Sequence, residues 1–145
     1  AKAFPNGIAE LSYGCCLLQC PGGVNILLDT SLGCIQPPIS PAMTVTRPLQ
    51  DLRVLLKEAA GLAPEDISVV VHTHLHRDHT SWNVVPGADG RPVPLFRNAT
   101  HVVQRVEWAY WTSTPALKER CGYEDYLAPI EAAGMLRLVD GDEDL

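Results

Sequence analysis

Short apolar runs separated by turn signals at the start of the chain predict a β-hairpin followed by a long loop. Gly14–Gln19 and Val24–Leu28 are the two β-type runs, and Pro21–Gly23 between them is a turn sequence. The next segment, Ser31–Pro48, has prolines at positions 37, 38, 41 and 48. Because proline disrupts helix interiors and central strands, we expect a surface loop there, of a length that often shapes a binding site.

Apolar residues with helical spacing come next and are followed by a continuous apolar run. Apolar residues recur every three or four positions from Leu49 to Ala59, and Gly61 is placed to cap the end of this amphipathic helix. Ile67–Val71 is then apolar at nearly every position and rich in β-branched residues. This composition predicts a strand that is buried on both faces of a sheet.

The remainder of the chain predicts further strands and helices with short connections. We expect a loop over Pro86–Pro94, a strand over Thr100–Gln104, a short helix over Glu107–Trp111, a helix over Tyr123–Ala133 and a strand over Leu136–Val139. Pro129 must kink or divide the helix over Tyr123–Ala133, and Gly134 ends it. Strands and helices in this order predict one α/β layered domain without repeats.

Composition and charge narrow the classes of function. With 145 residues, of which 46% are hydrophobic and 19% charged, the chain can form one domain with a core and does not have the composition of a disordered protein. A net charge of −6 leaves no broad basic face, so we expect a small-molecule substrate and no nucleic-acid partner. No apolar run approaches the ~20 residues that span a bilayer, and the start does not resemble a signal peptide, so we expect no membrane association.

The cysteines indicate a reducing environment. There are five of them, an odd number, and none forms a C-x-x-C pair. Cys15 and Cys16 are neighbours in an apolar run, which is more typical of reduced core thiols than of a disulfide framework or a cysteine zinc site. This usage favours a cytoplasmic location.

The strongest chemical signal is a histidine cluster directly after the apolar strand. Four of the five histidines lie within the eight residues His72–His79. In open α/β sheets, ligands gather at the carboxyl ends of strands. In locally extended chain His74 and His76 point the same way, so two imidazoles can reach one metal at about 2.0 to 2.1 Å. Asp78 and His79 can reach a second metal, and these residue types suit zinc, iron or manganese.

The competing explanation is a surface cluster or tag-like tract that binds metal without chemistry. An aspartate in register and a buried strand behind the cluster argue against it for His74, His76, Asp78 and His79. For His72, which lies nearer the sheet interior, we expect a buried, hydrogen-bonded histidine rather than a ligand. His101 lies in the middle of a predicted strand without partners, and we expect it to be structural.

The segment Thr73–His79 resembles the H-x-H-x-D-H signature of the metallo-β-lactamase superfamily. Leu27–Thr30 is similar to the family's strand-ending aspartate, and Gly61–Ile67 to the usual lead-in to its histidine strand. Short stretches around Ser81–Asn83, Phe96–Ala99 and Glu107–Trp108 are similar to the subgroup of acyl-homoserine lactonases and organophosphate hydrolases. The resemblance implies the N-terminal half of an αββα metallo-β-lactamase sandwich.

The resemblance also implies roles for particular residues. His74 and His76 would bind the first of two divalent metal ions, with zinc favoured, and Asp78 and His79 would bind the second. Asp29 would hold the ligand loop in position without itself binding a metal ion. The sequence departs from the family pattern at two positions, where Ser31 and Ser81 stand in place of glycines that form tight turns.

The family's downstream ligands have no counterpart among these residues. The fold normally supplies a further histidine for the first metal, a carboxylate that bridges both metals and a last histidine for the second metal. His101 comes too early for this role, and the terminal acidic residues Asp140, Asp142 and Asp144 are more typical of a solvated turn. We therefore expect residues 1–145 to be a metallo-β-lactamase-like domain truncated at its C-terminus.

The resemblance implies hydrolysis of a small ester or lactone by a metal-bound hydroxide, with Asp78 both as a ligand and as a residue that orients or deprotonates the water. The alternatives are another reaction of the same scaffold, namely thioester hydrolysis, phosphodiester cleavage or iron-dependent redox chemistry, or a non-catalytic metal-binding fragment. Trp82, Trp108 and Trp111 could line a substrate site together with the Ser31–Pro48 loop, but aromatic residues at such positions belong more often to the core.

Overall fold

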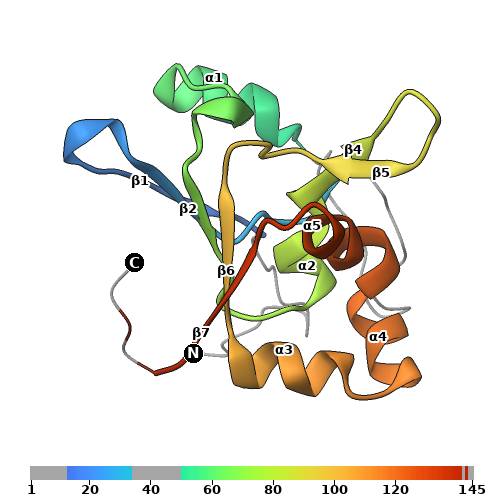
Figure 1. The fold of residues 1–145 in the computed structure, drawn as a ribbon. Coiled ribbons are helices and arrows are strands. Elements are labelled where there is room, and N and C mark those ends of the chain that lie inside the picture. Colours follow the sequence, from blue (N-terminus) through green and yellow to red (C-terminus); the bar gives the residue numbers. More distant parts are fainter. Residues whose placement is uncertain (1–12, 34–49, 142, 144–145) are drawn as a thin grey trace, which may run out of the picture.

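A five-stranded sheet organises the part of the chain that the computed structural model describes, residues 13–33, 50–141 and 143. The strands lie in the order β1-β2-β3-β6-β7 (Figure 1). Their bounds are β1 Cys16–Gln19, β2 Asn25–Leu28, β3 Val69–Val71, β6 Thr100–Gln104 and β7 Leu136–Val139. β1 and β2 are antiparallel, with Cys16 opposite Leu28, whereas β2, β3, β6 and β7 run parallel. The predicted hairpin and α/β class are thus confirmed.

The described helices are short and connect these parallel strands. They are α1 Leu52–Ala60, α2 Arg77–Thr80, α3 Arg105–Thr112, α4 Pro115–Cys121 and α5 Ala128–Ala132, with 3-10 turns η2 Pro21–Gly23, η3 Pro64–Asp66 and η4 Ser81–Asn83, and a π-helical turn η5 Tyr123–Leu127. The predicted cap of α1 is confirmed, since Gly61 has a φ of 71° and its N–H bonds the carbonyls of Leu56 and Lys57. At the other end of α1, Asp51 accepts a hydrogen bond from the N–H of Arg53.

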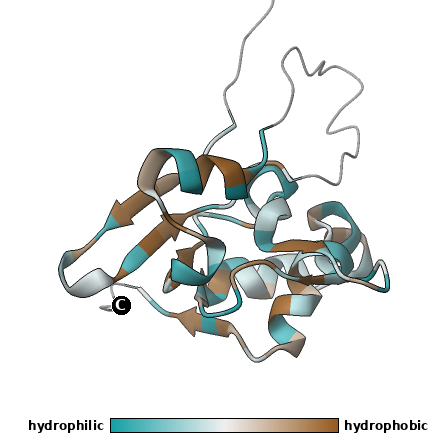
Figure 2. Cartoon of the chain, turned by 90° about the horizontal axis from the view of Figure 1, so that it is seen from above, coloured by the Kyte–Doolittle hydropathy of each residue, from teal (hydrophilic) through white to brown (hydrophobic). Residues whose placement is uncertain are grey.

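One face of the sheet carries the core. Leu27, Val70, His101 and Leu136 lie side by side across four strands on this face. Two buried clusters cover it: one joins β2 and β3 to α1 and Trp82, and the other joins β6 to α3, α4 and α5. In Figure 2 the strands are coloured mainly as hydrophobic, and the helices alternate between hydrophobic and hydrophilic turns. This is the pattern of helices that bury one side.

The prediction of a strand buried on both faces is wrong for the described residues. Only Val70 of β3 is buried, and Val69 and Val71 on the opposite face are half-buried. The apolar character of both faces is real, but the described helices cover only the Val70 face (Figure 1). The Val71 face is nevertheless partly covered, because Val102, which pairs with Val71, is 3% exposed.

The second half of the chain agrees only in part with the predicted elements. The predicted loop Pro86–Pro94 is the turn and second strand of a β-hairpin, in which β4 (Val84–Pro86) pairs with β5 (Pro92–Pro94). Prolines are tolerated there because both strands are short and lie at an edge. Helix α4 was not predicted, although Pro115 and Gly122 mark its two ends. The predicted division of Tyr123–Ala133 is confirmed, since η5 gives way to α5 just before Pro129.

The cysteine prediction holds only in part. Cys121 is buried, but Cys15 and Cys20 are half-buried and Cys16 is exposed, so the hairpin cysteines are not core thiols; all four are free. Most of the predicted loop Ser31–Pro48 lies outside the described residues. Within residues 13–33, 50–141 and 143, no helix is long and apolar enough to cross a membrane.

Candidate metal centre

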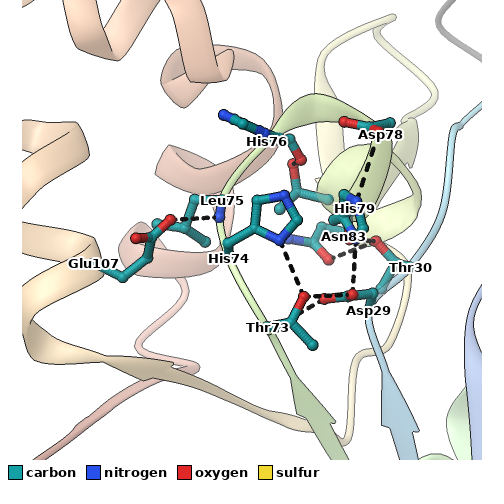
Figure 3. A network of polar contacts seen from close by, with 11 residues as sticks. Asp29, Thr30, Thr73, His74, Leu75, His76, Asp78, His79, Asn83 and Glu107 are labelled. Carbon is teal, nitrogen blue, oxygen red and sulfur yellow. Dashed lines mark hydrogen bonds and ion pairs between the residues drawn. The ribbon is translucent and has the colours of Figure 1, made fainter.

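The histidine cluster leaves the sheet at the carboxyl end of β3, between the ends of β2 and β6. Leu75 is fully buried in the core cluster of α3, α4 and α5, which turns His74 and His76 outward on either side of it. The ring centroids of His74 and His76 are 4.7 Å apart, and those of His74 and His79 are 4.0 Å apart. Figure 3 shows the three imidazoles grouped above the sheet edge. The sequence prediction that these side chains converge is therefore met for the imidazoles.

Helix α2 brings Asp78 beside His79. The distance from Asp78 Oδ2 to His79 Nε2 is 3.5 Å. Two ligands on one tetrahedral ion at ~2.0–2.1 Å are separated by roughly 3.4 Å, so this pair has the spacing of two ligands that share a metal. Arg77 holds α2 in place, because its guanidinium donates to the backbone carbonyls of Glu119 and Arg120 at the end of α4.

Asp29 fixes this arrangement from the end of β2. Its Oδ1 accepts a hydrogen bond from the Thr73 N–H at 2.9 Å, and its Oδ2 accepts one from the Thr73 hydroxyl at 2.7 Å. The same Oδ2 lies 2.8 Å from His79 Nδ1 (Figure 3). A carboxylate only accepts, so His79 Nδ1 is the donor in this contact and Nε2 is the nitrogen on the side of Asp78. This is the usual way in which a carboxylate orients a metal-binding imidazole.

The surroundings of His74 favour its neutral form. Burial lowers the pKa of His74, and the neighbouring His79 and His76 lower it further, although Asp29 and Asp78 act in the opposite direction. Its Nδ1 lies 3.1 Å from the Thr73 hydroxyl, which leaves Nε2 available. A neutral imidazole with one free nitrogen is the form that binds a metal ion.

His72 and His101 form a buried pair beneath the centre. His72 Nε2 and His101 Nδ1 are 3.1 Å apart. Burial lowers the pKa of His72 to about 3 and that of His101 to about 4, so both are neutral. The prediction that His72 is a buried, hydrogen-bonded residue is confirmed. His101 is structural as predicted, but the expectation that it lacks partners was wrong, because it pairs with His72.

The donors do not by themselves complete a metal site. Among residues 13–33, 50–141 and 143, no group of three or more His, Cys, Asp or Glu side chains is arranged to hold one ion. The assignment predicted from the sequence gives each ion two donors, where a tetrahedral ion takes four. The residues present therefore fit part of each coordination shell, and further ligands or water must supply the rest.

The tryptophans belong mainly to the core, as expected. Trp82 is 3% exposed and Trp111 5% exposed, while Trp108 is half-buried. The two departures from the family pattern differ in effect. Ser31 has a φ of 57°, in the left-handed region that favours glycine, whereas Ser81 has a helical φ of −67° and bonds the Arg77 carbonyl.

Sequence reasoning missed several residues that support the ligands. Thr30 donates to the Asn83 side chain at 3.0 Å and its N–H bonds the His79 carbonyl at 2.7 Å, so β2 holds α2 through the backbone. Glu107 accepts from the Leu75 N–H at 2.9 Å. The sequence does place Glu107 as an acidic residue in the first turn of a helix that follows a strand. Nothing in the sequence shows, however, that this side chain faces the ligand loop after β3.

The chain belongs to the metallo-beta-lactamase superfamily, whose family model matches residues 12–131. Among sequence relatives, the N-acyl homoserine lactonase AttM of Azorhizobium caulinodans is 49% identical over 53 residues, which are 37% of this chain and 16% of AttM. AttM of Agrobacterium fabrum matches with the same identity over the same length. These relatives are lactonases, so the family context is that of hydrolases.

Solved structures show the same fold over most of the chain. The hydrolase AbOPH of the beta lactamase superfamily is 24% identical with a TM-score of 0.61, and the match covers 86% of this chain and 42% of AbOPH. AidC, a dizinc quorum-quenching lactonase solved with a product, is 18% identical with a TM-score of 0.60, covering 89% of this chain and 43% of AidC. The chain thus spans about two-fifths of these proteins and has a partial metallo-β-lactamase fold.

Proposed function

We propose that this chain supplies half of a dinuclear metal centre in an enzyme that hydrolyses small esters or lactones. The observation that carries the proposal is the Asp29–His79–Asp78 arrangement, in which a carboxylate orients an imidazole whose free nitrogen lies 3.5 Å from a second carboxylate. This arrangement also holds the loop in place, but the orientation of an imidazole by a carboxylate is what a metal-binding histidine requires.

The residues divide between two ions. His74 and His76 would hold the first ion, and Asp78 and His79 the second, with zinc favoured and iron or manganese compatible with the donors. When bound, divalent ions would acidify a water molecule and polarise the substrate carbonyl. Asp78 would also orient that water and accept its proton, since its carboxylate is half-buried and lies beside the imidazoles.

The relatives support a substrate class for this proposal. AttM proteins, which share 49% identity over 53 residues with this chain, are N-acyl homoserine lactonases. We extend this activity to the protein that carries this chain, with acyl-homoserine lactones as the first substrates to test. The remaining ligands would come from sequence beyond these residues, because the solved neighbours are more than twice as long as the matched region.

Metal content and lactone hydrolysis test the proposal together. The protein at its native length, purified without chelators or an affinity tag, should contain close to two equivalents of metal and hydrolyse an acyl-homoserine lactone. His76→Ala and Asp78→Ala should each lose metal and activity, whereas Asp89→Ala, a change to an exposed residue of the β4–β5 turn, should lose neither. Full metal content in both ligand variants would overturn the ligand assignment, and activity without metal would overturn the mechanism.

A further inference from the structure

The peptide between the first pair of ligands is held by a side chain from another element. Leu75 separates His74 from His76, and its N–H donates to Glu107 Oε1 at 2.9 Å (Figure 3). Glu107 lies in the first turn of α3, which directly follows β6, the strand beside β3. Leu75 is therefore fixed twice, by its fully buried side chain and by its backbone N–H.

A second donor meets the same oxygen. The indole Nε1–H of Trp111, one turn further along α3, donates to Glu107 Oε1 at 2.7 Å. Trp111 is 5% exposed and belongs to the same core cluster as Leu75. Its ring also packs edge-on against the His76 imidazole, with centroids 5.1 Å apart. One carboxylate oxygen thus joins the ligand loop to a residue that contacts a ligand ring.

We propose that Glu107 is a positioning residue that sets the geometry of His74 and His76 for the first metal ion. This inference rests on the proposed function, because it assumes that these two imidazoles bind metal. Glu107 touches neither imidazole in the contacts described; it acts through the Leu75 N–H on one side and through Trp111 on the other. Without the Glu107 carboxylate, the Leu75 peptide between the two ligands would lose its hydrogen-bond acceptor. The indole of Trp111, which packs on His76, would lose the same acceptor.

A role confined to helix stability would look different. A first-turn acid stabilises its own helix through the N-terminal N–H groups of that helix or through the helix dipole. Here the carboxylate oxygen is directed instead at the peptide N–H of a separate segment, 32 residues earlier in the chain. Partners that orient metal ligands in this indirect way typically change metal affinity 10- to 100-fold when removed.

The test compares Glu107→Gln with Glu107→Leu in the protein at its native length. Glutamine keeps an oxygen that can accept both N–H groups, whereas leucine has a similar volume and accepts neither. Ile130→Ala serves as the control for simple destabilisation, because Ile130 is buried in the same cluster and no hydrogen bond among the described residues links it to the ligand loop. The readouts are the affinity for Co²⁺ with its visible absorption spectrum, and amide hydrogen exchange at Leu75 in metal-free protein.

Glu107→Leu should weaken binding at the first site by at least tenfold, alter the Co²⁺ spectrum and accelerate exchange at Leu75. Glu107→Gln should stay within about threefold of wild type, and Ile130→Ala should lower the melting temperature with metal affinity unchanged. Wild-type affinity and spectrum in Glu107→Leu would overturn the inference, as would equal losses in the glutamine and leucine variants. Failure of the wild-type protein to take up Co²⁺ would overturn the proposed function, and with it the metal-directed role of Glu107.

Discussion

Asp29→Asn is the substitution that tests the centre most directly. Asp29 is 7% exposed and its two oxygens accept three hydrogen bonds, two from Thr73 and one from His79. An asparagine keeps one acceptor oxygen but places an NH₂ group where the other oxygen was. The Thr73 hydroxyl can rotate and accept from that group, but His79 can do so only by moving its proton from Nδ1 to Nε2.

The new tautomer blocks the nitrogen that faces Asp78. We therefore expect the second metal site to lose affinity by 10- to 100-fold, the range typical for partners of ligating residues. The metal-free protein should lose about 2 kcal/mol of stability, because a hydrogen bond to a buried charged group contributes roughly 1.5 to 3 kcal/mol. For a domain of this size that corresponds to about 4 to 8 °C in melting temperature.

Metal titration, thermal unfolding and the ring nitrogen shifts of His79 measure these three effects separately. The matched control is Asp66→Asn, since the Asp66 carboxylate caps an exposed turn by accepting the Ala63 N–H at 2.8 Å. It should lower stability by about 1 kcal/mol or less and leave metal affinity unchanged. Wild-type affinity at the second site in Asp29→Asn, with the proton still on His79 Nδ1, would refute the reasoning.

Three further predictions concern stability. Ser31→Gly should raise the free energy of unfolding by about 0.5 to 1 kcal/mol in urea titrations, because φ at Ser31 is 57°; a loss of stability would contradict this. Gly33→Ala should lower it by about 1 to 3 kcal/mol in the same assay, since an added Cβ would lie 2.7 Å from the Ser81 carbonyl oxygen; an unchanged midpoint would argue against this contact. Because the pKa values of His72 and His101 are lowered in the folded state, the unfolded chain binds more protons than the folded chain below about pH 6.5. The free energy of unfolding should therefore be highest above that pH and decrease as the pH drops towards about 4. The slope should reach up to about 1.4 kcal/mol per pH unit for each histidine. Urea midpoints between pH 7.5 and 5 check this slope, and a flat profile would exclude it.

The sequence predicts the strands of the five-stranded sheet and the grouping of the candidate ligands because both depend on local pattern. The β-branched run before His72 and the spacing of His74, His76, Asp78 and His79 are local features, and a strand end exposes the side chains that follow it. Asp29 was also predicted as a supporting residue, but through family resemblance. Its three hydrogen bonds to residues at least 44 positions away are not encoded in any local pattern.

Contacts between distant segments explain what the sequence did not predict. The role of Glu107 depends on β6 pairing with β3, which brings the start of α3 over Leu75. The pairing of His72 with His101 depends on the same neighbouring strands. Helix α4 was missed for a different reason, since at seven residues it is too short for apolar periodicity to be visible.

The ligand loop lies at the seam between the two core clusters. Leu75, between the first pair of ligands, belongs to the cluster of α3, α4 and α5, whereas Trp82, just after the second pair, belongs to the cluster of β2 and α1. Because both pairs lie in the one loop that joins these clusters, metal ions bound to them would be lost if either cluster unfolded. At a free metal concentration 1,000 times the dissociation constant, each such ion stabilises the folded state by about 4 kcal/mol. Metal binding at the centre would thus stabilise the packing of both clusters at once.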